Sequence, residues 1–95
     1  MYSFEWDDDK NEINIKKHGV SFDEAKTVFF DDNALLEYDE LHSSYEERFR
    51  ILGISFKGNI LLVVHCLRNG SVIRIISSRK ATNKERQNYE RRIQL

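Results

Sequence analysis

Apolar residues recur along this chain with two different periods, and the change of period predicts where helices give way to strands. A short strand is predicted at residues 3–6. Asp8 or Asp9 then provides a helix cap, and a first helix is predicted to run through His18 and to end at Gly19 in the left-handed conformation. The apolar stripe of this helix is thin.

A second helix is predicted over residues 22–30. Ser21 and Glu24 before and within it have the spacing of a capping box, in which a hydroxyl and a carboxylate each bind a backbone N–H. One face of this helix collects the apolar side chains of Phe22, Ala25, Val28 and Phe29. This face is expected to pack on a sheet.

Strand patterns dominate the rest of the chain. Strands are predicted at residues 34–38, 48–56, 60–67 and 72–77, with a polar loop at residues 39–45. The last three strands are separated by short turns, and Asn69 with Gly70 supplies the two positive-φ residues of a tight hairpin. An antiparallel meander is therefore expected.

A final helix is predicted after this meander, because Thr82 and Glu85 repeat the capping-box spacing. Its apolar contacts are limited to Ala81, Tyr89 and Ile93. Together these elements predict an α+β fold, with two N-terminal helices and a C-terminal helix against a small antiparallel sheet. With 95 residues, no proline and no linker, residues 1–95 are expected to form one domain around one core.

Charge is divided between the two halves of the chain. Residues 1–47 hold fourteen acidic and four basic side chains, about −10, whereas residues 48–95 hold eleven basic and two acidic ones, about +9. The overall charge of −1 conceals this asymmetry. A basic half of this kind suits a polyanion, and nucleic acid is the first partner to consider.

Several other classes of protein are disfavoured. The longest apolar run, residues 60–64, is too short to span a bilayer, and an acidic cluster lies where a secretory signal would be basic and apolar, so the cytoplasm is the expected location. Cys66 is the single cysteine and is interpreted as a small apolar strand residue. No His, Cys or carboxylate spacing is typical of a metal site, so we predict neither metal nor cofactor.

Short segments in a fixed order cover nearly the whole chain. They include Phe4-Glu5-Trp6-Asp7, Lys17-His18-Gly19-Val20-Ser21-Phe22, Glu46-Glu47-Arg48, Arg74-Ile75-Ile76-Ser77-Ser78-Arg79, and Thr82 with Glu85, Arg86 and Tyr89. In this order and spacing the chain resembles the BrnT family, the toxin halves of BrnT/BrnA toxin–antitoxin pairs. One departure is Ser78, where the family commonly has alanine.

The resemblance implies a fold similar to the RelE-type ribonucleases and a metal-independent endoribonuclease. It also implies a BrnA-like antitoxin encoded beside the toxin, and we expect the pair to bind operator DNA mainly through the antitoxin. Two rival classes remain open from the residues alone. One is a nucleic-acid-binding module without chemistry, and the other is a protein-interaction domain whose acidic half binds a basic partner.

Metal-free RNA cleavage uses the substrate's 2′-hydroxyl as nucleophile, so it needs proton transfer and positive charge around the phosphorus. The predicted catalytic residues are Arg74, Arg79, His42, Glu47 and Arg48. Each has a structural alternative. Arg74 interrupts an apolar run and could instead be a paired core residue, His42 could organise its loop with Ser43, and Glu47 with Arg48 could be an ordinary ion pair.

The odd spacing of Arg74 and Arg79 would point them to opposite faces of a regular strand. Joint action therefore requires a bulge, or Arg79 beyond the strand end. The predicted RNA-binding residues are Lys17, His18, Lys80, Arg86 and Tyr89. Lys17 and His18 could instead simply oppose a helix dipole. His65, inside an apolar strand, is interpreted as a hydrogen-bonded core or sheet-face histidine rather than an acid–base group. Arg91 and Arg92 are interpreted as a solvated face, with phosphate contact as the alternative.

Overall fold

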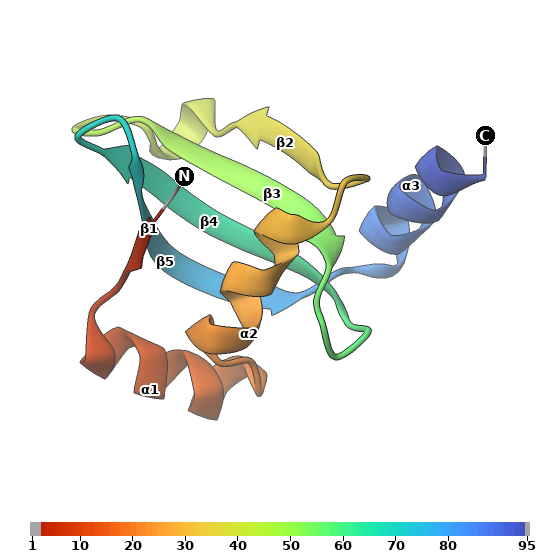
Figure 1. Cartoon of the computed structure of the whole chain (residues 1–95), viewed down its shortest axis with the longest axis horizontal. Coiled ribbons are helices and arrows are strands. Elements are labelled where there is room, and N and C mark those ends of the chain that lie inside the picture. Colours follow the sequence, from red (N-terminus) through yellow and green to blue (C-terminus); the bar gives the residue numbers. More distant parts are fainter. Residues whose placement is uncertain (1–2, 95) are drawn as a thin grey trace.

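The computed structural model describes residues 3–94, which form a five-stranded sheet and three α-helices (Figure 1). The elements in chain order are β1 (Ser3–Glu5), α1 (Asp8–His18), α2 (Phe22–Lys26), the 3-10 helix η1 (Thr27–Phe30), β2 (Leu35–Tyr38), the 3-10 helix η2 (Glu40–His42), β3 (Arg48–Ile54), β4 (Ile60–Arg68), β5 (Val72–Lys80) and α3 (Asn83–Ile93). The predicted α+β class is confirmed.

The strand order is β1-β5-β4-β3-β2, and the prediction of a wholly antiparallel sheet is wrong at one edge. β1 pairs with β5 in parallel, with Phe4 opposite Ile73 and Glu5 opposite Arg74. The other three pairings are antiparallel. The sheet is therefore mixed, and β1 occupies the edge of β5 that the meander leaves free.

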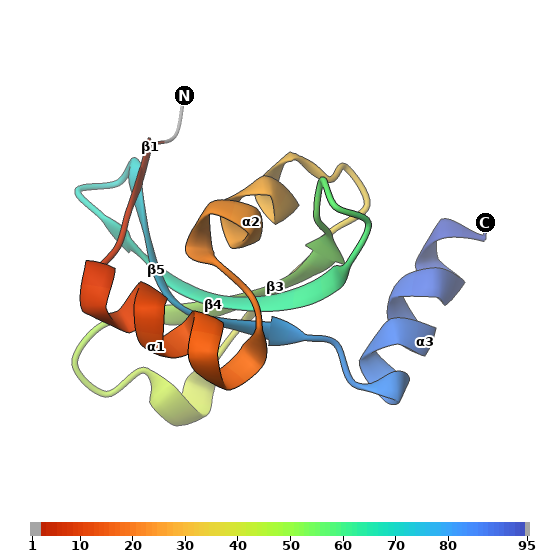
Figure 2. The same cartoon turned by 90° about the horizontal axis from the view of Figure 1, so that it is seen from below.

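One face of the sheet is covered by α1, α2 and η1. Val20, Phe22, Ala25 and Val28 pack there against Ile51, Leu61, Val63, Ile73 and Ile75, all of them buried. Figure 2 shows α2 and the loop containing η2 on opposite sides of the sheet, with α3 beyond one end. The second face, away from α1 and α2, is the less covered one.

Helix α1 begins one residue earlier than predicted. Asp7 is its N-cap and accepts hydrogen bonds from the backbone N–H groups of Asp9 and Lys10, while Gly19 ends the helix at φ 70° as predicted. The only buried residue of α1 is Asn14. Its side chain donates to the carbonyls of Val20 and Ser78 at 2.8 Å each and accepts from the N–H of Ser78 at 3.1 Å, so it joins α1 to β5.

The predicted second helix is shorter, because α2 ends at Lys26 and continues as η1. Ser21 caps it as predicted, accepting from the backbone N–H of Glu24. The carboxylate of Glu24 does not complete the capping box. It turns inward and accepts from Ser55 Oγ at 2.6 Å and from Asn59 Nδ2 at 2.9 Å, which ties α2 to the turn between β3 and β4.

The hairpin between β4 and β5 matches its prediction, with positive φ at Asn69 (53°) and Gly70 (77°). Strand β5 then runs to Lys80, further than predicted. Its pairing with β4 is interrupted by a bulge, since Val64 lies opposite Ser77 while His65 lies opposite Ile75, leaving Ile76 as the extra residue. The alternation of side chains between the two faces of the sheet is therefore shifted by one residue at Ile76.

The bulge places Arg74 and Arg79 on one face of the sheet. Arg74 lies opposite Cys66 and Arg79 opposite Leu62. Cys66 and Leu62 are four residues apart on β4, and such residues share a face. The bulge that joint action of Arg74 and Arg79 requires is therefore present, and both arginines lie on the less covered face.

Candidate active site

A cleft of about 320 Å³ lies on the less covered face of the sheet. Its polar lining consists of Asp39, His42, Arg48, Arg50, Ser77 and Arg79, and its apolar floor of Leu62, Val64 and Ile76. We call it the arginine cleft. Its lining holds three guanidinium groups and one carboxylate, and the carboxylates that pair with Arg50 and Arg79 lie outside it.

Asp39 and His42 form a dyad at one wall of the arginine cleft. His42 Nδ1 lies 3.1 and 3.2 Å from the two carboxylate oxygens of Asp39. The Asp39 side chain is 6% exposed and that of His42 is 65% exposed. Because an ionised carboxylate can only accept, Nδ1 carries the hydrogen, and Nε2 of a neutral imidazole is left as a proton acceptor.

The loop that carries His42 is closed by short-range hydrogen bonds. Ser43 Oγ donates to the carbonyl of Asp39 at 2.5 Å and accepts from the N–H of Arg48 at 2.9 Å. The N–H of Asp39 also donates to the carbonyl of Arg48. The loop-organising role predicted as an alternative for His42 and Ser43 therefore belongs to Ser43, whereas the imidazole of His42 stays at the cleft.

The three cleft arginines differ in their partners. Arg50 pairs with Glu37 of β2 at 2.8 Å, and Arg79 pairs with Glu85 of α3 through two bonds, at 2.7 and 3.0 Å. The Arg48 guanidinium has no ion pair or hydrogen bond within residues 3–94, and the Nε atoms of both Arg48 and Arg50 are buried donors without a partner. Such a donor is costly unless a ligand satisfies it.

The Arg79–Glu85 pair is permanently charged near neutral pH. The hydrogen bonds from Arg79 lower the pKa of Glu85 to about 2, and those same bonds raise the pKa of Arg79 above its usual range. Glu85 also accepts from the N–H of Thr82, whose hydroxyl binds the N–H of Glu85, so the predicted capping box of α3 is confirmed. One carboxylate thus caps α3 and orients Arg79.

Tyr89 holds α3 against the end of the sheet. It is 3% exposed, and its hydroxyl donates to Asp31 at 2.5 Å. Burial and this bond raise the pKa of Tyr89 to about 12. The prediction that Tyr89 contacts RNA is therefore not supported, because the ring has no accessible face on which a base could stack.

Arg74 and Glu47 lie outside the arginine cleft. Arg74 pairs with Glu5 of β1 at 2.9 Å, and Glu5 also lies 3.8 Å from Arg68. This matches the alternative in which Arg74 is a paired residue. Glu47 is exposed, and within residues 3–94 it makes no ion pair with Arg48 or any other side chain.

Four predicted RNA-binding residues are not brought together. Lys17 and His18 lie in the last turn of α1, on the opposite face of the sheet, where they oppose the helix dipole. Lys80 is exposed and lies opposite Leu61, on the α1 side of β5. Arg86 is exposed on α3.

Two cleft residues were missed from the sequence, Asp39 and Arg50. A signal existed for both. Asp39 precedes His42 by three residues, a spacing that lets two side chains meet on one helical turn. Arg50 follows Arg48 by two residues in a predicted strand and so shares its face.

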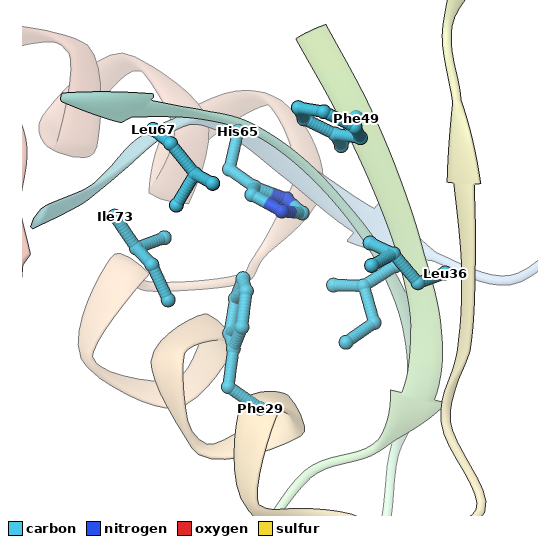
Figure 3. Close-up of a pocket in the computed structure, with 7 residues that line it drawn as sticks. Phe29, Leu36, Phe49, His65, Leu67 and Ile73 are labelled. Carbon is cyan, nitrogen blue, oxygen red and sulfur yellow. The ribbon is translucent and has the colours of Figure 1, made fainter. Parts of the chain in front are cut away.

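A second cavity, of about 170 Å³, lies on the helix-covered face and is apolar. Figure 3 shows His65 there with its ring between those of Phe29 and Phe49, and with Leu36, Leu67 and Ile73 around it. The ring centroids are 4.7 Å from Phe29 and 5.9 Å from Phe49. His65 is 4% exposed and its Nδ1 lies 3.3 Å from the Val63 carbonyl, as expected of a core histidine.

The burial of His65 should make the stability of the protein depend on pH. Burial lowers the pKa of His65 below its ordinary value of 6.5, although the bond to Val63 acts in the opposite direction. Below pH 6.5 the imidazole of His65 binds a proton in the unfolded chain but not in the folded protein. The free energy of unfolding should therefore fall as the pH drops from 6.5 toward the lower pKa of the folded state. Melting temperatures between pH 5 and 8 measure this effect. The variant His65→Phe should flatten that part of the curve, and an unchanged slope would contradict the assignment.

Within residues 3–94 no group of three or more His, Cys, Asp or Glu side chains is arranged to hold a metal ion. No helix in the same range is long and apolar enough to cross a membrane.

Comparison with known proteins identifies a family and a similar solved structure. A family model described as the ribonuclease toxin BrnT of type II toxin–antitoxin systems matches residues 6–85. The crystal structure of the Brucella abortus ribonuclease toxin BrnT, at 1.1 Å resolution, is similar with a TM-score of 0.68 at 21% sequence identity, covering 87% of this chain and 100% of that one. No curated protein sequence matches the chain. The structural likeness supports the α+β fold.

Proposed function

This chain belongs to the BrnT family of ribonuclease toxins of type II toxin–antitoxin systems, and from that premise we propose that it cuts RNA in the arginine cleft without a metal ion. The observation that carries the proposal is the meeting of the Asp39–His42 dyad with three guanidinium groups at one cleft. A base and a concentration of positive charge are the two things that 2′-hydroxyl attack requires. The proposal places this activity in the cytoplasm, as one RelE-like domain.

In the proposed reaction, Nε2 of His42 accepts the proton of a ribose 2′-hydroxyl. The 2′ oxygen forms a bond to phosphorus while the bond from phosphorus to the 5′ oxygen breaks. The departing oxygen takes up a proton from water, and the resulting hydroxide removes the proton from the His42 imidazolium, which restores the neutral base. The products are a 2′,3′-cyclic phosphate and a 5′-hydroxyl end. Asp39 is a positioning residue that fixes the tautomer and orientation of His42 and stabilises the imidazolium that forms.

Arg48, Arg50 and Arg79 would neutralise the phosphate as it gains negative charge. A planar guanidinium can hold two phosphate oxygens at once, which suits a pentacoordinate phosphorus better than a point charge does. Arg50 and Arg79 are already oriented by Glu37 and Glu85, so their reorganisation on binding RNA is small. Arg48 would gain its first partner in the phosphate.

We also propose that a small BrnA-like antitoxin, encoded next to this chain, inhibits it by covering the arginine cleft and part of α3. An acidic or apolar segment laid on this face would exclude RNA without entering the chemistry. Operator DNA binding by the pair would come mainly from the antitoxin, since the basic face of this chain would be occupied by it.

Purified protein incubated with total RNA in EDTA should release fragments with 2′,3′-cyclic phosphate or 3′-phosphate ends. Adding the co-expressed neighbouring protein in equimolar amount should suppress cleavage, and the two proteins should co-purify. Cleavage that EDTA abolishes and magnesium restores would contradict metal independence. RNA retention without cleavage would favour a binding module, and neither retention nor cleavage would favour a protein-interaction domain.

A further inference from the structure

A second hollow, of about 110 Å³, lies beside the arginine cleft on the same face of the sheet, between β2, β3 and α3. Its floor is apolar and is formed by Leu35, Leu52 and Leu62. Its polar lining comprises Glu37, Arg50, Glu85 and Asn88. We call it the α3 pocket. An apolar floor with a small number of polar groups is the usual composition of a site for a small organic ligand.

The α3 pocket and the arginine cleft are continuous through shared residues. Arg50 and Leu62 line both. The Arg79–Glu85 and Arg50–Glu37 ion pairs also cross the boundary, with the arginines lining the cleft and the carboxylates lining the pocket. A ligand held with its phosphate in the cleft therefore has the pocket as the adjoining compartment.

The charges of the two compartments differ. The arginine cleft presents three guanidinium groups beside the single carboxylate of Asp39, and the Arg48 guanidinium has no carboxylate partner within residues 3–94. In the α3 pocket, each carboxylate is paired with an arginine, so the compartment is close to neutral and an anion gains nothing there. A neutral ring attached to a phosphate would satisfy both compartments.

The pocket retains hydrogen-bonding capacity on its polar side. One oxygen of the largely exposed Glu37 carboxylate forms the ion pair with Arg50, and the other has no protein partner within residues 3–94. The side-chain amide of Asn88 likewise makes no hydrogen bond within that range and offers both a donor and an acceptor. Both oxygens of Glu85 are already bonded by Arg79, so the free oxygen of Glu37 is the acceptor of the pocket, and it favours a ligand that presents N–H donors.

From these observations we propose that the α3 pocket binds an unpaired nucleobase next to the scissile phosphate, and that it prefers guanine. Guanine presents two adjacent N–H donors on its Watson–Crick edge, which match a carboxylate, and beside them a carbonyl oxygen that matches the amide N–H₂ of Asn88. The leucine floor would contact the face of the ring. This inference rests on the proposed ribonuclease function and adds a base preference to it.

The pocket is too small to enclose a whole base, so a base could be only partly inserted. A closed cavity of about 150 Å³ is enough to hold benzene in other proteins. The α3 pocket is smaller and is open toward the arginine cleft, so the sugar and phosphate of a nucleotide would lie outside it. Double-stranded RNA could not enter in this way, because its bases are stacked and paired, which predicts action on single-stranded segments.

The first test measures binding of the four nucleoside 3′-monophosphates to the full chain by amide chemical shifts. Guanosine 3′-monophosphate should bind at least about tenfold more tightly than the other three, with the largest shifts at Glu37, Leu52 and Asn88. Glu37→Gln and Asn88→Ala should each remove most of that preference. The matched controls are Glu90→Gln and Gln87→Ala on exposed positions of α3, which should keep it.

The second test maps cleavage sites in a random single-stranded RNA pool. Wild-type protein should cut next to guanine, and Asn88→Ala should cut with weaker base preference. Equal binding of all four nucleotides, or an unchanged cleavage pattern in both pocket variants, would overturn the base pocket while leaving the ribonuclease proposal intact. Selective binding of guanosine 3′-monophosphate without any RNA cleavage would instead overturn the proposed function and keep the pocket.

Discussion

Replacing Arg48 by alanine should lower the rate of RNA cleavage by about 10²–10³-fold, the range found when one donor to a transition-state oxyanion is removed. Arg48 is the cleft arginine whose guanidinium has no protein partner within residues 3–94, so its interaction with phosphate is not offset by a lost ion pair. The melting temperature should stay the same or rise slightly, because the variant removes a buried donor that nothing satisfies. Initial rates on a fluorescent single-stranded RNA and a thermal melt measure both quantities.

Arg74→Ala is the matched comparison, because Arg74 is a second arginine on the same face of the sheet, outside the arginine cleft. We expect the fold-loss in cleavage rate caused by Arg74→Ala to be at least about ten times smaller than that caused by Arg48→Ala. The variant should also lower the melting temperature, because it breaks the ion pair with Glu5. A folded Arg48→Ala protein with full activity, alongside an inactive and folded Arg74→Ala protein, would move the site from the cleft to the β1 edge.

Asn14→Ala should destabilise the protein by about 3–5 kcal/mol, because it leaves two carbonyls and one N–H without partners, at roughly 1–3 kcal/mol for each buried group. The Asn14 side chain is 5% exposed, so water cannot replace these bonds without opening the packing of α1. A domain of this size is stable by only about 5–14 kcal/mol, so the melting temperature should fall by roughly 15–30 °C. Urea unfolding followed by circular dichroism measures the change.

Asn11→Ala provides the scale for this result. Asn11 is on the same helix, and its side chain accepts one hydrogen bond, from the N–H of Phe22 at 2.8 Å. Its loss should cost about 1 kcal/mol. If Asn14→Ala cost no more than Asn11→Ala, the three bonds of Asn14 would not be what holds α1 to β5.

Sequence spacing was sufficient to predict a hydrogen bond where its two residues lie close together in the sequence and have no competing partner. The capping box of α3 was predicted because Thr82 and Glu85 satisfy one another within one turn. The same spacing at Ser21 and Glu24 gave only half a capping box, since the Glu24 carboxylate is bound by Ser55 and Asn59 of the turn between β3 and β4. A distant partner outcompeted the local one, and nothing in the spacing distinguishes the two cases.

Long-range pairing explains the other differences. β1 pairs in parallel with β5, about seventy residues away in sequence, so no turn motif between the two strands could predict the pairing. That pairing also brings Glu5 to Arg74, and so makes a predicted catalytic arginine an ion-paired one. His42, Arg48 and Arg79 were predicted by residue type, whereas Arg50 was overlooked because an arginine in a strand is also typical of an ordinary solvent-exposed position.

The bulge at Ile76 makes the length of β5 as important as its composition. If one residue were deleted between Arg74 and Arg79, the strand could regain regular pairing, and one of the two arginines would rotate to the helix-covered side together with its neighbours. A point substitution at Ile76 would leave this geometry largely in place. Sequence variation in this segment should therefore be dominated by exchanges of side chains, and insertions or deletions should be confined to the hairpin at Asn69 and Gly70, where an added residue does not change the phase of the strand.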